Sequence, residues 1–394
     1  MSDMSMPTKK SAAEWSAWAD EQSLRLAERA QAAEEMRSVP PETISDARAA
    51  GFFAMLTPET LGGQAASFGI FLYVVRRLSR GCVSSGWTLS FLALHAWLLA
   101  KFDKPLQDTL FRDGATPLMP APLAPTGEAA KVDGGYLVNG RWEWATGVNH
   151  ADWVMVSCIE PEGMGPRFCI VRIEDVEVLD VWRTAGMAAT GSNTVIIRDL
   201  FVPEHMTLAA WQLKLAASPG EALHPRSTVV YPMSATLALV AATPALGALE
   251  AAVDIFRNRM KSKMQAYGDV RQGDLPVTHL RLGEAIAAHQ AAGALWDDAI
   301  KRLERDGPLG HQTPLETLVA IRVASASIVR LANDAIDRLA GAAGASAGFL
   351  SFPLQRQLRD VQMMRGHVVF DWDRAAQIAG KVALGREPAF SDLL

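Results

Sequence analysis

This sequence of 394 residues has few of the features that would assign it directly to a class of protein. It has only three cysteines, Cys82, Cys158 and Cys169, which are too few and too far apart for a disulfide framework or a zinc motif. We therefore expect a reducing, cytoplasmic location. No uninterrupted apolar run reaches about 18 residues, and residues 1–10 are polar, so neither a membrane-spanning helix nor a secretory signal peptide is expected.

An excess of positive charge is also missing. Lysine and arginine total 38 against 43 aspartates and glutamates, which gives a formal charge of −5. This balance offers no basic field for nucleic acid or for an anionic membrane surface. Neither kind of partner is expected.

Common nucleotide and metal motifs are absent as well. The chain has no Gly-x-x-x-x-Gly-Lys-Ser/Thr loop, no Gly-x-Gly-x-x-Gly after a predicted strand and no His-Glu-x-x-His pair. The eight histidines are scattered, so no metal site is expected. Chemistry in such a protein is expected to depend on a bound organic cofactor.

The pattern of apolar residues changes twice and predicts three domains, residues 1–112, 113–215 and 225–394. In the first domain apolar residues recur at helical spacing, and the runs 71–78 and 87–102 are apolar enough for buried helices. The first domain is therefore predicted to be helical.

The middle domain is predicted to be β-structure. Short runs such as 153–156, 168–171 and 195–197 are rich in β-branched and aromatic residues and are separated by Gly, Pro, Asp and Asn clusters. This spacing predicts a compact β-barrel or sandwich. Trp142 and Trp144 lie two residues apart, which predicts that they share one face of a strand.

The third domain contains four segments with the length and periodicity of long bundle helices, 235–263, 277–306, 313–342 and 354–384. Pro244 is expected to kink the first of them or to mark its true start. The predicted fold class is α+β but mostly α, and it ends in a four-helix bundle.

Local motifs along most of the chain resemble those of the acyl-CoA dehydrogenase superfamily. They resemble an early Pro-Glu-x-x-Gly-Gly turn, the strand laid against the flavin ring, the segment closing the β-domain and the start of the last bundle helix. In this sequence they are Pro58–Gly63, Gly135–Gly147, Gly186–Asn193 with Phe201–Pro203, and Pro353–Asp360. The resemblance implies the acyl-CoA dehydrogenase fold, with an N-terminal helical domain, a middle β-barrel domain and a C-terminal four-helix bundle.

Within that superfamily the chain is more similar to the oxygenase components of two-component flavin monooxygenases, the family of 4-hydroxyphenylacetate 3-hydroxylase and related phenol hydroxylases. His95 resembles the active-site histidine of these hydroxylases, and His150 follows the tryptophan-rich strand as it does there. Many acyl-CoA dehydrogenases place a catalytic glutamate where this chain has His367 and Val368. Because dehydrogenation of a thioester needs a carboxylate base, the resemblance favours oxygenation.

The resemblance implies hydroxylation of a small aromatic, expected phenolic, substrate by reduced FMN or FAD and O2 through a flavin C4a-(hydro)peroxide. A separate NAD(P)H:flavin reductase would supply reduced flavin by diffusion, because the sequence carries no nicotinamide fingerprint. The family buries one bundle face between subunits, so the resemblance also implies a homotetramer.

It also implies roles for individual residues. His367 would protonate or hydrogen-bond the flavin peroxide, and His95 would deprotonate or polarise the substrate hydroxyl. Thr146 would hydrogen-bond near flavin N5, and Trp144 and Gly147 would bind the ring beside it.

For the phosphate end of the flavin, the resemblance points to Arg259 and to Ser346 in a glycine-rich turn, as contacts across a subunit boundary. The substrate pocket is expected to include His95, Ala121 and Ser192. The phenol hydroxylases tend to carry a pocket serine before an Ala-Pro-x-Gly stretch, and the corresponding segment of this chain, 120–127, has no hydroxyl at the matching place. They also often have Arg-Gly in place of 188–189, which are both alanine here. Both changes make the pocket less polar, so a bulkier substrate and N- or S-oxygenation stay open.

The sequence is also compatible with two different functions. A protein of the same fold can hold oxidised FAD as an acyl-CoA dehydrogenase or oxidase, or can be a helical scaffold without cofactor. His95 can be a satisfied core histidine among leucines, and Arg259 an ordinary solvated charge.

Overall fold

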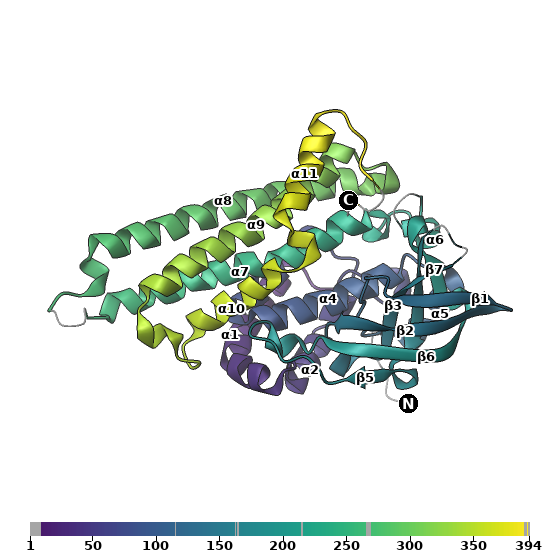
Figure 1. Cartoon of the computed structure of the whole chain (residues 1–394), viewed down its shortest axis with the longest axis horizontal. Coiled ribbons are helices and arrows are strands. Elements are labelled where there is room, and N and C mark those ends of the chain that lie inside the picture. Colours follow the sequence, from purple (N-terminus) through teal and green to yellow (C-terminus); the bar gives the residue numbers. More distant parts are fainter. Residues whose placement is uncertain are drawn as a thin grey trace.

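The computed structural model places helices first, then one sheet, then a second set of helices, as the sequence predicts (Figure 1). Residues 1–8 of the polar N-terminal segment and the predicted domain boundary at residue 215 lie outside the described residues. The structure describes residues 9–114, 116–161, 163, 165–213, 216–264, 269–389 and 392.

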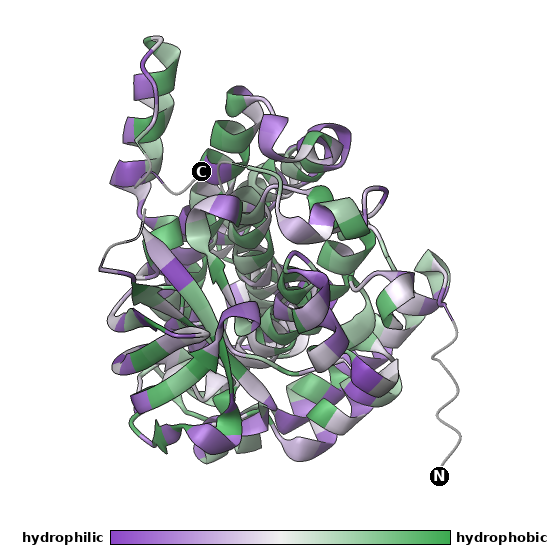
Figure 2. Cartoon of the chain, turned by 90° about the vertical axis from the view of Figure 1, so that its right-hand side faces the viewer, coloured by the Kyte–Doolittle hydropathy of each residue, from purple (hydrophilic) through white to green (hydrophobic). Residues whose placement is uncertain are grey.

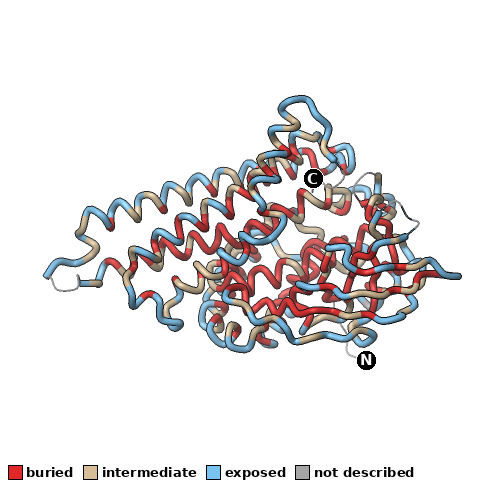
Figure 3. Tube along the Cα trace, viewed as in Figure 1, coloured by how far each residue is buried: buried red, intermediate tan, exposed pale blue. Residues whose placement is uncertain are grey.

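The N-terminal part contains five α-helices, of which α4 is central. Every residue of α4 except Phe91 is buried, because Trp, Leu and Ala occur on all of its sides. The buried stretches of chain gather where the N-terminal helices, the sheet and the bundle meet (Figure 3). The helices are α1 (Ala12–Met36), α2 (Pro41–Ala49), α3 (Phe68–Gly81), α4 (Val83–Leu99) and α5 (Lys104–Leu110).

The middle part forms one seven-stranded sheet in the order β5-β6-β2-β1-β3-β4-β7. All neighbouring pairs are antiparallel except β1 and β3, and the hydrogen-bonded order does not close on itself among the described residues. Hydrophilic and hydrophobic residues alternate along several strands (Figure 2). The strands are β1 (Gly127–Val132), β2 (Gly135–Ala145), β3 (Trp153–Ile159), β4 (Pro166–Arg172), β5 (Glu177–Leu179), β6 (Asn193–Pro203) and β7 (Thr207–Ala209).

The C-terminal part is built on the three long helices α7, α8 and α9 and the shorter helix α10. A short helix α6 (Pro219–Leu223) precedes α7 (Met233–Ser262), which continues through Pro244 rather than starting there. The remaining helices are α8 (Pro276–Asp306), α9 (Leu315–Ala342), α10 (Pro353–Arg365) and α11 (Trp372–Ala383).

The prediction of one continuous helix over 354–384 is wrong. Helix α10 ends at Arg365, a short 3-10 turn covers Val368–Phe370, and α11 then turns away from the bundle (Figure 1). Gly366 and two successive β-branched valines favour this break, and Asp371 caps α11 by accepting from the Arg374 amide. As a result His367 has an extended backbone conformation between α10 and α11 and does not lie on a helix.

Helix α7 is the one helix among the described residues with the length and hydropathy of a membrane span. In the structure 89% of its apolar window is buried inside the protein, as in the core helix of a bundle.

Candidate active site

A row of aromatic rings on α4 connects the two histidines. Trp87, Phe91 and His95 follow one another at four-residue spacing and therefore share a helix face. The Trp87 and Phe91 rings stack with centroids 4.5 Å apart, and Phe91 meets the His95 ring edge-on at 5.5 Å. His367 meets the other end of the row, with its ring 5.8 Å from Trp87. We call these four residues the aromatic row.

His95 is held as a neutral base. Its Nδ1 lies 2.8 Å from the carbonyl oxygen of Met119, and because a carbonyl only accepts, Nδ1 carries the proton. Nε2 is then a lone pair, and this buried atom has no hydrogen-bond partner in the described part of the chain. Burial lowers the pKa of His95 to about 4, so the ring is uncharged at neutral pH.

His367 carries its ring proton on the other nitrogen, Nε2, and is also held neutral. The backbone N–H of Val369 donates to Nδ1 of His367 at 3.2 Å, so the ring proton is on Nε2. The residue is exposed on one side, while its ring packs between Trp87 and Phe370. The surrounding protein and then the charge of Arg322 lower the pKa of His367, which leaves it a neutral hydrogen-bond donor.

The end of β2 turns Trp144 outward. The β2–β6 register shifts between Trp142 and Ala145, and Trp144 takes the left-handed φ of +64°. Trp142 is fully buried and donates to the Ser157 carbonyl, whereas Trp144 is 59% exposed. The prediction that the two tryptophans share a face is wrong, because the irregularity rotates one of them out of the strand pattern.

A hollow of about 220 Å³ lies beside Trp144. This is room for several water molecules, or for part of a planar ring, at about 30 Å³ per water. Trp144 beside the hollow is a bulky residue at positive φ, so its backbone is strained, and such strain is concentrated at functional sites. The hollow is lined by Pro122, Ala124, Thr126, Arg141, Trp142, Glu143 and Trp144.

Thr146 and Gly147, just after the end of β2 at Ala145, bring the sheet onto α4. Thr146 is nearly buried, and its hydroxyl lies 3.0 Å from that of Ser192. Gly147 has a φ of +75°, and a Cβ there would meet side-chain carbons of Thr88 at 3.0 Å and Leu92 at 3.3 Å. Only glycine fits this turn against α4 without displacing its neighbours.

Ala121 lies close along the chain to the partner of His95. It follows Met119 by two residues and packs, partly buried, against the core. The structure thus places His95 and the Ala121 segment together, while Thr146 and Ser192 meet where the sheet approaches α4. His150 instead contacts the Ser38 hydroxyl at 3.1 Å.

Two charged residues of this region were not predicted as site residues. Arg322 on α9 is 2% exposed, donates to the Val368 carbonyl at 3.1 Å, and leaves Nε and Nη1 without a partner in the described structure. Asp360 on α10 accepts from the Met187 amide at 2.6 Å and the Ser84 hydroxyl at 3.1 Å. A lone arginine within an apolar helical run was the available sequence signal for Arg322.

Arg259 and Ser346 lie together at the far end of the bundle. The Arg259 guanidinium contacts the Ser346 hydroxyl at 2.5 Å and the Ala343 carbonyl at 3.2 Å. Along α9, Ala343 is about 30 Å from Arg322 at 1.5 Å per residue. Within one chain these two residues are therefore not part of the site at the aromatic row.

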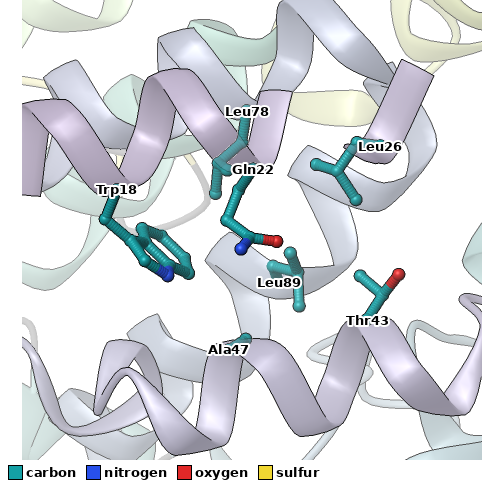
Figure 4. A pocket seen from close by; sticks show the side chains of 7 residues that line it. All are labelled: Trp18, Gln22, Leu26, Thr43, Ala47, Leu78 and Leu89. Atoms are coloured by element: carbon teal, nitrogen blue, oxygen red, sulfur yellow. The ribbon is translucent and has the colours of Figure 1, made fainter. Parts of the chain in front are cut away.

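No group of three or more His, Cys, Asp or Glu side chains is placed to hold a metal ion in the ranges given above. A gap between α1, α2 and the helices behind them has no room for a water molecule (Figure 4). It is lined by Trp18, Gln22, Leu26, Thr43, Ala47, Leu78 and Leu89.

Two family descriptions match most of the helical parts of the chain. Residues 12–107 match the acyl-CoA dehydrogenase N-terminal domain, and residues 239–372 match the acyl-CoA dehydrogenase C-terminal domain.

Several curated proteins are similar over almost the whole chain. The pigment production hydroxylase of Rhodococcus sp. (strain ATCC 21145) is 34% identical over 364 residues, which cover 91% of this chain and 93% of that protein. The flavin-dependent monooxygenase oxygenase subunit HsaA of Mycobacterium tuberculosis (strain H37Rv) is 33% identical, covering 92% and 93%. The oxygenase component of p-hydroxyphenylacetate 3-hydroxylase from Acinetobacter baumannii is 30% identical, covering 92% and 87%.

Solved structures of flavin-dependent monooxygenases are similar to this chain as well. The crystal structure of the HsaA monooxygenase from M. tuberculosis superimposes with a TM-score of 0.89 at 29% identity, covering 98% of this chain and 100% of that one. XiaF from Streptomyces sp., in complex with FADH2 and glycerol, gives 0.88 at 26% identity, covering 96% of each chain. Since the similarity extends over the whole fold and reaches 30% identity or more to several such proteins, this chain belongs to the acyl-CoA dehydrogenase-fold family of flavin-dependent monooxygenases, as an oxygenase component.

Proposed function

We propose that this protein hydroxylates a small phenolic substrate with reduced flavin and O2. The observation that carries the proposal is the opposite hydrogen-bonding state of the two histidines on one aromatic row. His95 offers a lone pair at Nε2 and His367 offers an N–H at Nε2. Two relatives are named for p-hydroxyphenylacetate and for resorcinol, and both compounds are phenols.

His95 is proposed to accept the hydroxyl proton of the substrate. Its Nε2 is buried beside Phe91 and has no competing partner among the described residues, so a phenol O–H is the complement it lacks. Removing or polarising that proton makes the ring electron-rich, which aids attack by an electrophilic oxygen. Ala121 in the adjoining segment leaves room and adds no competing polar group.

The residues around Trp144 fit a flavin ring. The exposed indole beside the hollow supplies a flat surface. Thr146, two residues further along the chain, would supply a hydrogen-bonding group for the edge of the ring. When bound, reduced flavin would supply two electrons to O2, so that one oxygen atom is transferred to the substrate and the other leaves as water. His367 would hold a proton at Nε2 and donate a hydrogen bond toward that oxygen. The proposed cofactor is either reduced FMN or reduced FAD.

A separate NAD(P)H:flavin reductase is proposed to deliver the reduced flavin. The relatives are named as oxygenase components or subunits, which supports a partner with the reducing activity. The three cysteines are free and buried, in keeping with a cytoplasmic location.

A homotetramer is proposed to complete the cofactor site. The Arg259–Ser346 pair lies about 30 Å along the bundle from Arg322, which contacts Val368 next to His367 of the aromatic row, so the pair would serve the flavin phosphate of another copy. Val277 and Leu280 on α8 are each 55% exposed, and they are apolar surface that such an assembly would cover.

The test is rapid mixing of the protein and reduced FMN with oxygenated buffer, with and without a simple phenol. We expect slow return of oxidised flavin absorbance, and hydroxylated phenol as product. His95→Asn keeps a donor for the Met119 carbonyl but has no base at Nε2, so it should lower product per flavin oxidised at least 10-fold. His311→Asn, at an exposed position, is the control.

Immediate return of free oxidised flavin with no product would refute the proposal. Anaerobic bleaching of tightly bound oxidised FAD by an acyl thioester would instead identify a dehydrogenase. Oxygenated amine or sulfide products would identify N- or S-oxygenation.

A further inference from the structure

We propose that Ser192 and Thr190 are positioning residues that force the Thr146 hydroxyl to act as a hydrogen-bond acceptor, so that the site discriminates between reduced and oxidised flavin. The three hydroxyls form a chain, which we call the hydroxyl relay. The inference rests on the proposed function, since it requires the flavin ring beside Thr146.

The relay ends on a carbonyl that can only accept. The oxygen of Met187 receives the Thr190 hydroxyl at 2.8 Å, the Thr190 amide at 3.1 Å and the indole N–H of Trp182 at 3.0 Å. Met187 is itself fixed, because its amide donates to the buried Asp360. The single hydroxyl proton of Thr190 is therefore committed to Met187.

The direction of the other two bonds follows from this end. The Thr190 and Ser192 hydroxyl oxygens are 2.7 Å apart, and since the proton of Thr190 is committed, Ser192 must donate. The Thr146 and Ser192 oxygens are 3.0 Å apart, and since the proton of Ser192 is now committed, Thr146 must donate. Thr146 thus faces any further ligand with lone pairs only.

Burial keeps the relay in this arrangement. Thr190 is 2% exposed, Ser192 4% and Thr146 9%, so solvent offers little alternative bonding. Reversing one bond would leave a buried donor or acceptor unsatisfied, which is costly.

The flavin atom expected at Thr146 changes character with oxidation state. In reduced flavin N5 carries a hydrogen and donates, whereas in oxidised flavin N5 is a lone pair and accepts. An obligatory acceptor at Thr146 satisfies the reduced ring and opposes the oxidised one. One hydrogen bond gained in one state and lost in the other is expected to change the ratio of affinities by about 10-fold. The relay would thereby favour loading of reduced flavin and release of the oxidised product.

The test compares dissociation constants for FMN in air and for dithionite-reduced FMN under anaerobic conditions, and then repeats the comparison with FAD. Ser192→Ala frees the hydroxyl proton of Thr146, and Thr190→Val frees the hydroxyl proton of Ser192. Both variants should therefore bind oxidised flavin more tightly than wild type does. The ratio of the dissociation constant for oxidised flavin to that for reduced flavin should fall by about 3- to 10-fold. Thr190→Ser keeps the hydroxyl and should retain the wild-type ratio. Ser157→Ala is a matched control, since Ser157 is buried in β3 and its hydroxyl has no partner among the described residues.

The outcomes separate the two proposals. If Ser192→Ala and Thr190→Val bind flavin with the wild-type ratio, the relay assignment is refuted while the proposed function stands. If Ser157→Ala changes the ratio as much as Ser192→Ala, the effect is general loss of packing and the assignment is also refuted. If the wild-type protein binds neither form of either flavin, both proposals fail.

Discussion

Replacing Asp360 by asparagine tests how the junction of α4 and α10 carries a buried charge. The carboxyl group is 3% exposed, and although it accepts two hydrogen bonds, burial raises its pKa from 3.8 to about 6. A carboxyl whose pKa is higher in the folded than in the unfolded state binds its proton more tightly when folded, so stability falls as pH rises from about 4 to about 6. The difference between the two values is equivalent to about 3 kcal/mol.

The asparagine side chain would be neutral at every pH and would still offer an oxygen to the Met187 amide. We therefore expect Asp360→Asn to be about 2–3 kcal/mol more stable than wild type at pH 8, and the gain to shrink toward zero at pH 4. Urea denaturation midpoints at several pH values measure this difference directly. Asp297→Asn, at an exposed carboxylate on α8, is the control and should show no such trend. A variant that is destabilised equally at pH 4 and pH 8 would show that the hydrogen bonds, not the buried charge, dominate.

Three further predictions, two of substitutions and one of the wild-type protein, concern the site. Trp144→Asn should leave the denaturation midpoint unchanged or raised, because asparagine tolerates the φ of +64°, while the affinity for reduced FMN falls at least 10-fold; unchanged affinity would remove Trp144 from the flavin site. Arg322→Met should raise the pKa of His367, measured by NMR titration of the imidazole, since the Arg322 charge lowers it; no change would mean the charge is screened. Binding of a phenol to the wild-type protein should be independent of pH from about 5.5 to 8, because the pKa of His95 is about 4, and an inflection near 6.5 in a binding titration would contradict that burial.

Local signals predicted the parts of this structure that depend on local sequence. The helix, sheet and helix order follows from periodicity. The Thr146-Gly147 turn and His95 lie in motifs within single segments, and their roles in the site stay predictions. The break after Arg365 was missed, because α10 and α11 are both amphipathic and only Gly366 and the capping Asp371 separate them.

The remaining features depend on contacts between distant segments. The polarity of the hydroxyl relay requires Thr146 to meet Ser192, and the raised pKa of Asp360 requires α10 to lie on α4 at Ser84. Sequence spacing cannot supply either contact, since the partners are far apart in the chain. The proton positions on His95 and His367 depend likewise on which backbone group each ring meets.

The burial of His95 also constrains when it can act. Protonating this imidazole costs about 3 kcal/mol more than in water, because its pKa lies near 4 rather than 6.5. Solvent therefore does not protonate it at neutral pH, and the lone pair stays available. Under the proposed function, a phenol that gave up its proton there would leave a phenolate beside the new imidazolium, and the attraction between the two opposite charges in a region of low dielectric would offset much of that cost. Proton transfer to His95 would then be favourable only with the phenol in place, and the apolar neighbours of His95 would keep solvent from protonating it at other times.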